Sequence, residues 1–287
     1  MQCDACRNEA VISQQYSGRR MCRRHFVADL EAKAKRSIRA HRWLGSGDHI
    51  GVMVSGDKQS GALLYFMKKL TQDRRDITLS VIPGDGEFAD CGNRLSAERI
   101  AALLGLPGIS SVSEDSGAIP GKETRSPQDA GTLLHDLRYE GTGPAACITK
   151  VAVAFTLEDM ARGVLARFLR GNLDTFVHPS SSPHGSLPVI CPFGSIPSAE
   201  LELYWDCLGT GLDHLPCTQV RDAFTDRVAG LLDDYNTRHP ATHHALLHIG
   251  EQLTEGKVAS LVGTHGDCGV SRCGTCGFIR EGKGNGT

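Results

Sequence analysis

Four cysteine and histidine residues near the start of the chain have the spacing of zinc ligands. A Cys-x2-Cys pair is followed after fifteen residues by a Cys-x2-His pair, and the four residues are Cys3, Cys6, Cys22 and His25. Zinc takes four tetrahedral sulfur or nitrogen ligands, and a Cys-x2-Cys turn presents two thiolates to one ion. Four protein ligands leave no position for water, so the spacing predicts a structural zinc ribbon. The alternative is a set of scattered reduced residues.

A short Ser/Gly turn between an apolar run and a helix-compatible run could bind a phosphate. The apolar run is Ile50–Val54 and the helical run is Ser60–Met67. Backbone N–H groups and the helix dipole favour an anion at a helix N-terminus, and Ser55, Lys58 and Ser60 add donors. The spacing is not that of a Walker P-loop. An ordinary strand-to-helix turn remains the alternative.

Positive charge is concentrated in residues 19–42, although the whole chain has a formal net charge of −2. Nine Lys and Arg residues stand against only Asp29 and Glu31 between Gly18 and Trp43. Most lie on a helix predicted over Phe26–Arg42. The nine are Arg19, Arg20, Arg23, Arg24, Lys33, Lys35, Arg36, Arg39 and Arg42. This basic face predicts contact with a nucleic-acid backbone, the alternative being a solvated surface helix.

Composition and length set the class of protein. The chain has 287 residues, of which 40% are hydrophobic, enough for one large core with small appendages. It has neither the apolar segment of a signal peptide near Met1 nor a run of eighteen apolar residues, so we expect a cytoplasmic protein without a membrane span. Eleven cysteines in such a chain are expected to be metal ligands or catalytic thiols rather than disulfides.

Apolar runs alternate with helical patterns in the middle of the chain, which predicts an α/β fold with a doubly wound parallel sheet. Ligands of such sheets bind at the carboxyl ends of the strands, where Ser55 and Asp85 fall. Asp85 lies in a Pro-Gly-Asp-Gly turn and could equally serve the turn itself. The expected strands are Ile50–Val54, Ile77–Ile82, Ile109–Val112 and Cys147–Phe155, and the expected helices include Leu95–Leu104, a helix from Thr156 to about Asn172, and Ala223–Asp233.

Further acids, thiols and imidazoles are candidates for chemistry. Glu158 and Asp159 follow Thr156 at a helix start, where they could cap the helix or bind Mg2+. Cys191 and Cys217 fall near the expected carboxyl edge and are candidate reactive thiols, whereas Cys147 and Cys207 are expected in the core. The histidines that cluster after Asp233 are expected on a helix surface, and they are His239, His243, His244 and His248.

Together these motifs resemble the tRNA 2-thiouridine synthetase family of PP-loop ATP pyrophosphatases. The ribbon comes first, and the loop Ser55–Ser60 resembles the family's S-G-G-x-D-S, with Asp57 at the second Gly and Gln59 at the Asp. The family's H-N-L-D-D…L-L-R-G-D and I-P-E-K-E-V-x-x-Y motifs correspond to Thr156-Leu157-Glu158-Asp159…Phe168-Leu169-Arg170-Gly171-Asn172 and to Ile196–Tyr204. The resemblance covers nearly the whole chain.

The resemblance implies a Rossmann-like PP-loop domain that uses ATP to activate a carbonyl oxygen of a tRNA base and replaces it with sulfur. It implies ATP contacts from Ser55, Gly56, Asp57, Lys58, Ser60 and Asp85. It implies catalytic roles for Lys58, for Asp159 with Mg2+, and for Cys217 as a thiol. It also implies a second zinc finger near the C-terminus, formed by His265, Cys268, Cys273 and Cys276, the alternative being a redox-exposed cysteine tail.

The chain departs from the family where an iron–sulfur cluster is usually held. Ser126-Pro127-Gln128-Asp129 stands in place of a Cys-x2-Cys pair, and only Cys217 matches the family's third cluster cysteine. An iron–sulfur cluster is therefore not supported in its usual place.

We expect three parts: an N-terminal ribbon at 1–30, an ATP-binding domain at 31–258 and a C-terminal finger at 259–287. The expected partners are tRNA, through the basic segment, and a sulfur donor protein, and the chain could form a homodimer. Two other functions stay open: a nucleotide- or RNA-binding protein that has lost thiolation, and an enzyme that adenylates an acceptor other than tRNA.

Overall fold

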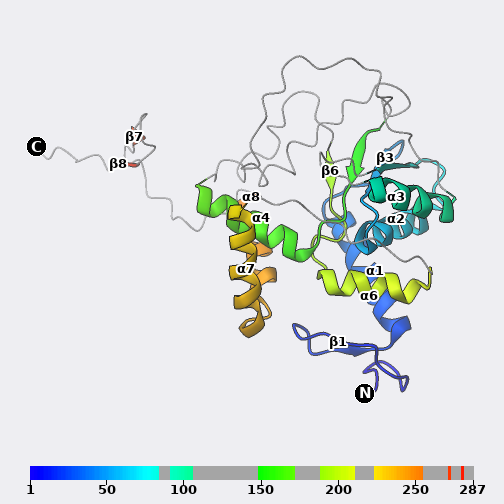
Figure 1. The fold of residues 1–287 in the computed structure, drawn as a ribbon, viewed down its shortest axis with the longest axis horizontal. Coiled ribbons are helices and arrows are strands. Elements are labelled where there is room, and N and C mark those ends of the chain that lie inside the picture. Colours follow the sequence, from blue (N-terminus) through cyan, green and yellow to red (C-terminus); the bar gives the residue numbers. More distant parts are fainter. Residues whose placement is uncertain are drawn as a thin grey trace, which may run out of the picture.

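A parallel four-stranded sheet forms the centre of the computed structural model, which describes residues 1–83, 91–105, 148–171, 188–210, 223–254, 271–272 and 279–280. The strand order is β4-β3-β5-β6 (Figure 1). The strands are β3 (His49–Val54), β4 (Thr78–Pro83), β5 (Lys150–Ala152) and β6 (Val189–Ile190). Every neighbouring pair is parallel, so all four carboxyl ends meet at one edge. The predicted α/β fold with a parallel sheet is confirmed.

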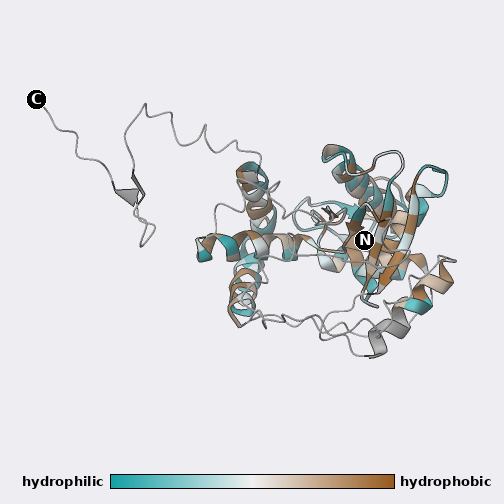
Figure 2. Cartoon of the chain, turned by 90° about the horizontal axis from the view of Figure 1, so that it is seen from above, coloured by the Kyte–Doolittle hydropathy of each residue, from teal (hydrophilic) through white to brown (hydrophobic). Residues whose placement is uncertain are grey.

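Side chains of alternate residues on β3 point to opposite faces of the sheet, as the two-residue period of a strand requires. Ile50, Val52 and Val54 are fully buried and belong to the main core. Met53, next to them in sequence, packs against a smaller cluster that includes Val151 and Cys191. Figure 2 shows the hydrophobic strands in brown.

The main core is completed by four helices that pack with the sheet. They are α1 (Arg23–Ala40), α2 (Lys58–Thr71), α3 (Cys91–Leu103) and α6 (Ser198–Leu208). Helix α6 contacts both α1 and α2. At Gly61 of α2, an added Cβ would lie 2.8 Å from the Trp205 ring of α6. Glycine at this position therefore lets the helix that begins at the Ser/Gly turn pack directly on α6.

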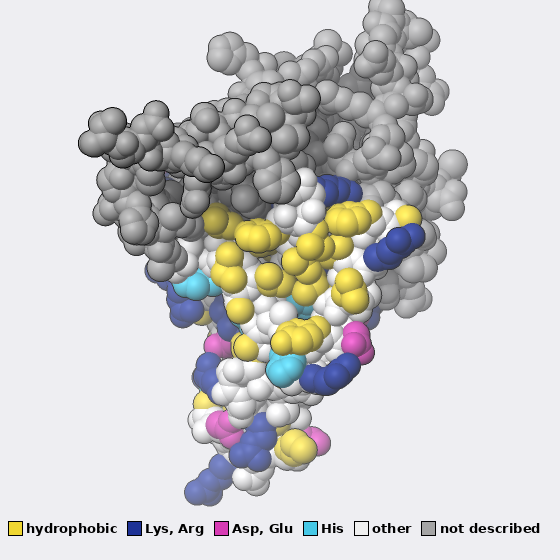
Figure 3. Space-filling view, turned by 90° about the vertical axis from the view of Figure 1, so that its left-hand side faces the viewer, with side chains coloured by type: hydrophobic (Ala, Val, Ile, Leu, Met, Phe, Trp, Pro, Cys, Tyr) yellow, Lys and Arg dark blue, Asp and Glu magenta, His cyan; other side chains and the backbone are white. Residues whose placement is uncertain are grey.

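A second group of helices lies beside the sheet and consists of α4 (Leu157–Arg170), α7 (Ala223–Arg238) and α8 (Thr242–Thr254) (Figure 1). The view onto that side shows hydrophobic side chains gathered on the surface (Figure 3). The most exposed large apolar residues of these helices are Phe168, Leu169, Phe224, Leu231, Tyr235 and Ile249. None of the helices in the described residues is long and apolar enough to cross a membrane.

Two short antiparallel pairs lie near the chain ends. Strands β1 (Ile12–Ser13) and β2 (Arg20–Met21) pair in the N-terminal ribbon. Strands β7 (Ser271–Arg272) and β8 (Ile279–Arg280) pair near the C-terminus.

Element boundaries differ from the sequence predictions in two informative places. Helix α1 begins at Arg23 rather than Phe26, because the turn that carries the Cys-x2-His ligands is itself the first helical turn. Strand β5 is shorter than the predicted Cys147–Phe155, although Thr149 and Val153 still donate backbone hydrogen bonds to neighbouring segments. It pairs with β3 over three residues and with β6 over two.

Candidate functional site

The four predicted ribbon ligands lie together, with their ligand atoms all within 4.8 Å of one another. The Nδ1 atom of His25 is 3.4 Å from Cys3 Sγ and 3.3 Å from Cys22 Sγ, and the Sγ atoms of Cys6 and Cys22 are 3.6 Å apart. Four ligands at normal Zn–S and Zn–N distances form a tetrahedron with edges of about 3.5 to 3.8 Å. The donor set and its spacing therefore fit a closed zinc site.

The protonation state of Cys3 also suits a metal ligand. Burial alone would raise the pKa of its thiol, but hydrogen bonds from the backbone of Cys22, Ala5 and Cys6 and from the His25 ring lower it to about 6. A thiol with this pKa is mostly thiolate at neutral pH, and the thiolate is the form that binds metal.

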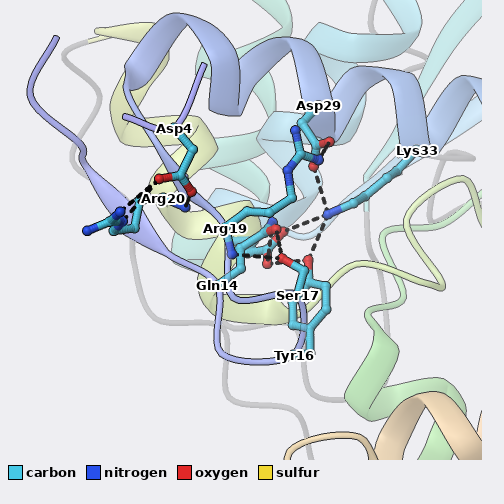
Figure 4. A network of polar contacts seen from close by, with 9 residues as sticks. Asp4, Gln14, Tyr16, Ser17, Arg19, Arg20, Asp29 and Lys33 are labelled. Atoms are coloured by element: carbon cyan, nitrogen blue, oxygen red, sulfur yellow. Dashed lines mark hydrogen bonds and ion pairs between the residues drawn. The ribbon is translucent and has the colours of Figure 1, made fainter. Parts of the chain in front are cut away.

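A buried carboxylate, Glu200 on α6, fastens the ribbon to the rest of the protein. Its Oε1 atom accepts hydrogen bonds from Gln14 Nε2 at 3.0 Å and from the Tyr16 hydroxyl at 2.7 Å. Lys33 Nζ donates to the same Tyr16 hydroxyl at 2.7 Å and lies 3.6 Å from Glu200 Oε2. Figure 4 shows Gln14, Tyr16 and Lys33 converging, with Asp29 bridging Lys33 and Arg19. The ribbon is thus held by charge-assisted hydrogen bonds rather than tethered loosely.

The Ser/Gly turn lies at the carboxyl end of β3, an inner strand of the sheet, as predicted. Gly56 adopts a φ of +89°, a conformation that residues with a Cβ rarely adopt. Asp57 is the N-cap of α2, and its Oδ1 accepts a hydrogen bond from Ser60 N at 2.7 Å. The Ser60 hydroxyl in turn accepts one from Ser55 N at 3.2 Å. A carboxylate of the protein itself therefore occupies one donor of the predicted phosphate site.

Lys58 points to α6, where it forms an ion pair with Asp206. Its Nζ atom is 2.8 Å from Asp206 Oδ1 and 3.0 Å from Oδ2. The Lys58 side chain is 21% exposed and the Asp206 side chain 54% exposed. Such a partly exposed pair is worth little in stability, so the ammonium can exchange this partner for another anion.

Glu158 and Asp159, the acids predicted near the sheet edge, both cap the N-termini of helices. Thr156 and Asp159 form a reciprocal capping box at the start of α4, and Asp159 also pairs with Arg162 at 3.1 Å. Glu158 Oε2 accepts a hydrogen bond at 2.9 Å from Ser198 N, at the start of α6. The capping alternative accounts for these contacts, and the Mg2+ role of Asp159 stays a prediction.

Of the candidate thiols, Cys191 follows β6 at the same edge but is buried. Burial, with a smaller contribution from Asp159, raises the pKa of its thiol to about 12. A thiol in this state is a poor nucleophile at neutral pH, so Cys191 behaves as a core residue. Cys207, which was predicted in the core, is partly buried and packs against the main core.

The histidine cluster is only partly on the surface. His248 is exposed, but His243 is 3% exposed, and burial lowers the pKa of its imidazole. The ring of His244 lies 4.9 Å from the Tyr16 ring of the ribbon, and burial lowers its pKa as well. For His243 the surface prediction is wrong, because α8 packs closely on α4, with Gly250 of α8 against Val164, whereas His244 is partly buried.

The basic segment divides into paired and unpaired cations. The pairs at its start join Arg19 to Asp29 and Arg20 to Asp4, and further along it Lys33 and Lys35 pair with acids of α1. The remaining arginines are exposed and form no ion pair among the described residues. Arg23 donates a hydrogen bond to the carbonyl of Cys207, and the others are Arg24, Arg36, Arg39 and Arg42. Unpaired cations on the exposed face of α1, and directly after its end, are free to meet phosphates.

Several predicted site residues lie outside the described residues. They are Asp85, Cys217, His265, Cys268, Cys273 and Cys276, together with Cys147 and the segment 126–129 that replaces the family's cysteine pair. Conversely, sequence inspection missed Asp206 and Glu200. Glu200 could have been suspected, because it is an acid within the I-P-x-x-E motif, whereas no local pattern singles out Asp206.

Comparison with known proteins begins at the ribbon, where residues 2–27 match the family described as "2-thiouridine synthetase TtuA, N-terminal LIM domain". The tRNA-5-methyluridine(54) 2-sulfurtransferase of Pyrococcus horikoshii is 25% identical over an alignment of 263 positions that covers 84% of this chain and 79% of the relative. The tRNA 2-thiolation protein NcsA of Haloferax volcanii is 23% identical over 96% of this chain and 94% of its own length.

Two further relatives extend the likeness. Cytoplasmic tRNA 2-thiolation protein 1 of Bos taurus is 26% identical, with 95% of this chain and 83% of the relative covered. The solved structure of the U34-tRNA thiolase NcsA from Methanococcus maripaludis with its 4Fe–4S cluster has the same fold, with a TM-score of 0.72, 18% identity, and coverage of 89% and 88%. The resemblance to the tRNA 2-thiouridine synthetase family is confirmed.

Proposed function

We propose that this protein is a tRNA sulfurtransferase of the PP-loop type. ATP binds at the Ser55–Ser60 loop, a carbonyl oxygen of a tRNA base attacks the α-phosphorus, and pyrophosphate leaves. Sulfur then replaces the adenylated oxygen and AMP departs. The reaction takes place in the cytoplasm and draws on a sulfur donor protein.

The observation that carries the proposal is the likeness to proteins named for tRNA 2-thiolation along nearly the whole chain. The geometry supports it, because the Ser/Gly turn lies at the carboxyl end of an inner parallel strand, where nucleotides bind in sheets of this class. Lys58, in the first turn of α2, is the cation best placed to stabilise the leaving pyrophosphate.

The acceptor RNA is held in this proposal by the unpaired arginines of the basic segment. The exposed cations Arg24, Arg36 and Arg39 lie on α1, and Arg42 follows its end. A helix of this length spans about 27 Å, enough for several phosphates of one RNA strand. These contacts position the RNA without selecting a sequence.

The implied cofactors differ in how well the described residues suit them. Cys3, Cys6, Cys22 and His25 suit zinc, which would hold the ribbon closed. Mg2+ would accompany ATP, and Asp159 is its candidate ligand from this chain. The Methanococcus relative is named with an iron–sulfur cluster. Among the described residues, the four ribbon ligands are the only group of cysteines and histidines close enough together to hold a metal.

The competing function is a nucleotide- or RNA-binding protein that has lost thiolation. One observation favours it: the carboxylates of Asp57 and Asp206 already occupy donors of the loop. An enzyme that adenylates an acceptor other than tRNA is the narrower alternative.

Pyrophosphate release from ATP, measured with and without bulk tRNA, tests the proposal. We expect release that depends on tRNA, together with a 2-thiolated nucleoside detected by mass spectrometry when a sulfur source is added. ATP bound without any pyrophosphate release would favour the binding protein. Release that is indifferent to tRNA would point to another acceptor.

A further inference from the structure

Two donors of the Ser/Gly loop, the Ser60 backbone N–H and the Lys58 ammonium, already have carboxylate partners in the protein. Asp57 Oδ1 lies 2.7 Å from Ser60 N, and Asp206 Oδ1 lies 2.8 Å from Lys58 Nζ. One carboxylate comes from the loop itself, whereas the other comes from α6, far along the chain. One backbone N–H of the loop and its ammonium group are therefore each engaged by a carboxylate, and the two carboxylates come from separate segments.

We propose that Asp57 and Asp206 are internal anions that compete with the polyphosphate of a nucleotide and so set the affinity of the loop. This inference rests on the proposed function, since it takes the loop as the nucleotide site. Asp57 occupies the position where the family has an uncharged glycine. Competition between this carboxylate and the polyphosphate is therefore a feature of this chain. The two acids thus make the loop selective for a ligand that brings enough charge to displace both.

Capping alone does not require a charge at position 57. Asn and Ser cap a helix as well as Asp does, because the N-cap needs only an oxygen acceptor. A full negative charge a few ångströms from a bound phosphate lowers anion affinity by about tenfold or more at the effective dielectric of a protein surface. The charge of Asp57, rather than its capping, is therefore the feature that acts on the ligand.

Asp206 acts through Lys58 rather than on the ligand directly. Helix α6 cannot drift away from α2 easily, because Trp205 packs against Gly61 one residue before the acid. The carboxylate is thereby kept within reach of the ammonium, although it is itself half exposed. A phosphate that binds Lys58 has to replace this partner.

Calorimetric binding of ATP and of inorganic pyrophosphate, without Mg2+, tests the inference on the full chain. The proteins are the wild type, Asp57→Asn and Asp206→Asn, with Asp73→Asn as a control that makes the same charge change beyond the other end of α2. We expect Asp57→Asn to bind both ligands about tenfold more tightly. Asp206→Asn should bind them about two- to fivefold more tightly, because the partly exposed pair with Lys58 is worth less than a full charge beside the ligand. The control should match the wild type, and thermal unfolding should show that Asp57→Asn keeps its cap.

The outcomes separate this inference from the proposed function. Equal affinities for the wild type and both variants overturn the inference while nucleotide binding stands. Tighter binding in the variants, combined with no thiolated product from any of them, supports the inference and removes the proposed function instead. Absence of binding by every protein overturns both, because the loop would then not be a nucleotide site.

Discussion

At the scale of single residues, the loop and the start of the sheet depend on a few ion pairs between segments far apart in the sequence. Lys58 and Asp206 are one such pair. Lys150 and Asp48 are another, at the opposite edge of the sheet, with Nζ 2.7 Å from Oδ2. The first pair is partly exposed and exchangeable, whereas the second is shielded and joins the starts of β3 and β5. The first therefore bears on function and the second on stability.

Substitution of Lys58 by Ala should lower the rate of pyrophosphate release at least about a hundredfold, because no other described cation replaces its charge in the first turn of α2. Steady-state release assays measure this. Arg75→Ala, which removes an exposed cation beyond the other end of α2, serves as the control and should keep the wild-type rate. A Lys58→Ala protein with normal turnover would rule the lysine out of catalysis.

The Asp48 carboxylate should make the fold sensitive to acid. Burial would raise its pKa, but hydrogen bonds from Lys150 and from the backbone N–H of Gly45 hold the pKa below 3.8. A group with a lowered folded pKa stabilises the protein above its unfolded pKa, and this stabilisation is lost as the pH falls through the folded value.

Asp48→Asn should therefore lower the free energy of unfolding by about 1 kcal/mol at pH 7 and by less near pH 2. Denaturant titrations at both pH values measure the difference. Asp73→Asn is the control, because Asp73 is exposed and forms no ion pair among the described residues, so the substitution should change stability little. A loss for Asp48→Asn that is the same at both pH values would contradict the assignment.

At the scale of elements, α6 connects the parts on which the proposed function depends. Glu200 holds the ribbon, Asp206 holds Lys58, and Glu158 caps the first turn of α6 from α4. Arg23 of α1 also donates a hydrogen bond to the carbonyl of Cys207. The position of α6 therefore sets both how the ribbon docks and how the loop is neutralised.

Gly61→Ala should destabilise the protein although alanine favours helices. The propensity gain is about 1 kcal/mol, but the added Cβ would lie 2.8 Å from the Trp205 ring, and overpacking typically costs about 1 to 3 kcal/mol. We expect a net loss in denaturant unfolding. Gly163→Ala in α4 is the matched control: it has nothing within 4 Å and should gain stability. Equal gains for both would show that α2 and α6 are less closely packed.

The ribbon should bind zinc, and loss of the zinc ion should loosen the first turn of α1. Cys22→Ser should lose about one zinc per chain, because Cys22 is a predicted ligand. Loss of the metal should loosen α1, because Cys22 is also the residue directly before its first turn. Metal analysis and thermal unfolding measure the two effects. Cys207→Ser, which changes a thiol outside the cluster, should retain the metal content. Iron instead of zinc in the wild type would revise the assignment of the ion.

At the scale of the whole molecule, charge is distributed unevenly. The formal net charge of −2 leaves no general attraction for RNA, so the proposed tRNA contact depends on local cations. The unpaired arginines of α1 and Arg42 supply them, whereas the arginines near the ribbon are neutralised by acids.

Replacing Arg36, Arg39 and Arg42 together by Ala should weaken tRNA binding and make it less dependent on salt. The slope of log affinity against log salt should fall by about one unit for each phosphate that the arginines no longer neutralise. Filter binding across a series of salt concentrations measures both effects. Arg238→Ala, which removes a cation paired with Asp234, is the control and should leave the slope unchanged. An unchanged slope in the triple variant would place the RNA on another surface.

The sequence by itself determined the features that depend on local spacing. Cys-x2-Cys and Cys-x2-His turns bring ligands together because each turn is short, and the ribbon ligands lie together as predicted. The turn at Ser55 follows from an apolar run that stops at glycine, and Thr156 followed by Asp159 specifies a helix start. In each case neighbours in sequence are neighbours in space.

Only the tertiary structure decided which groups from distant segments meet these motifs. Lys58 pairs with Asp206 across 148 positions of sequence, and Tyr16 meets Glu200 across 184. His243 is buried because α8 packs on α4, which the pattern of its own helix did not indicate. The spacing of residues within a segment determines which ligand that segment can bind. The packing of helices on the sheet determines which charged side chains are already paired and which remain available to a ligand.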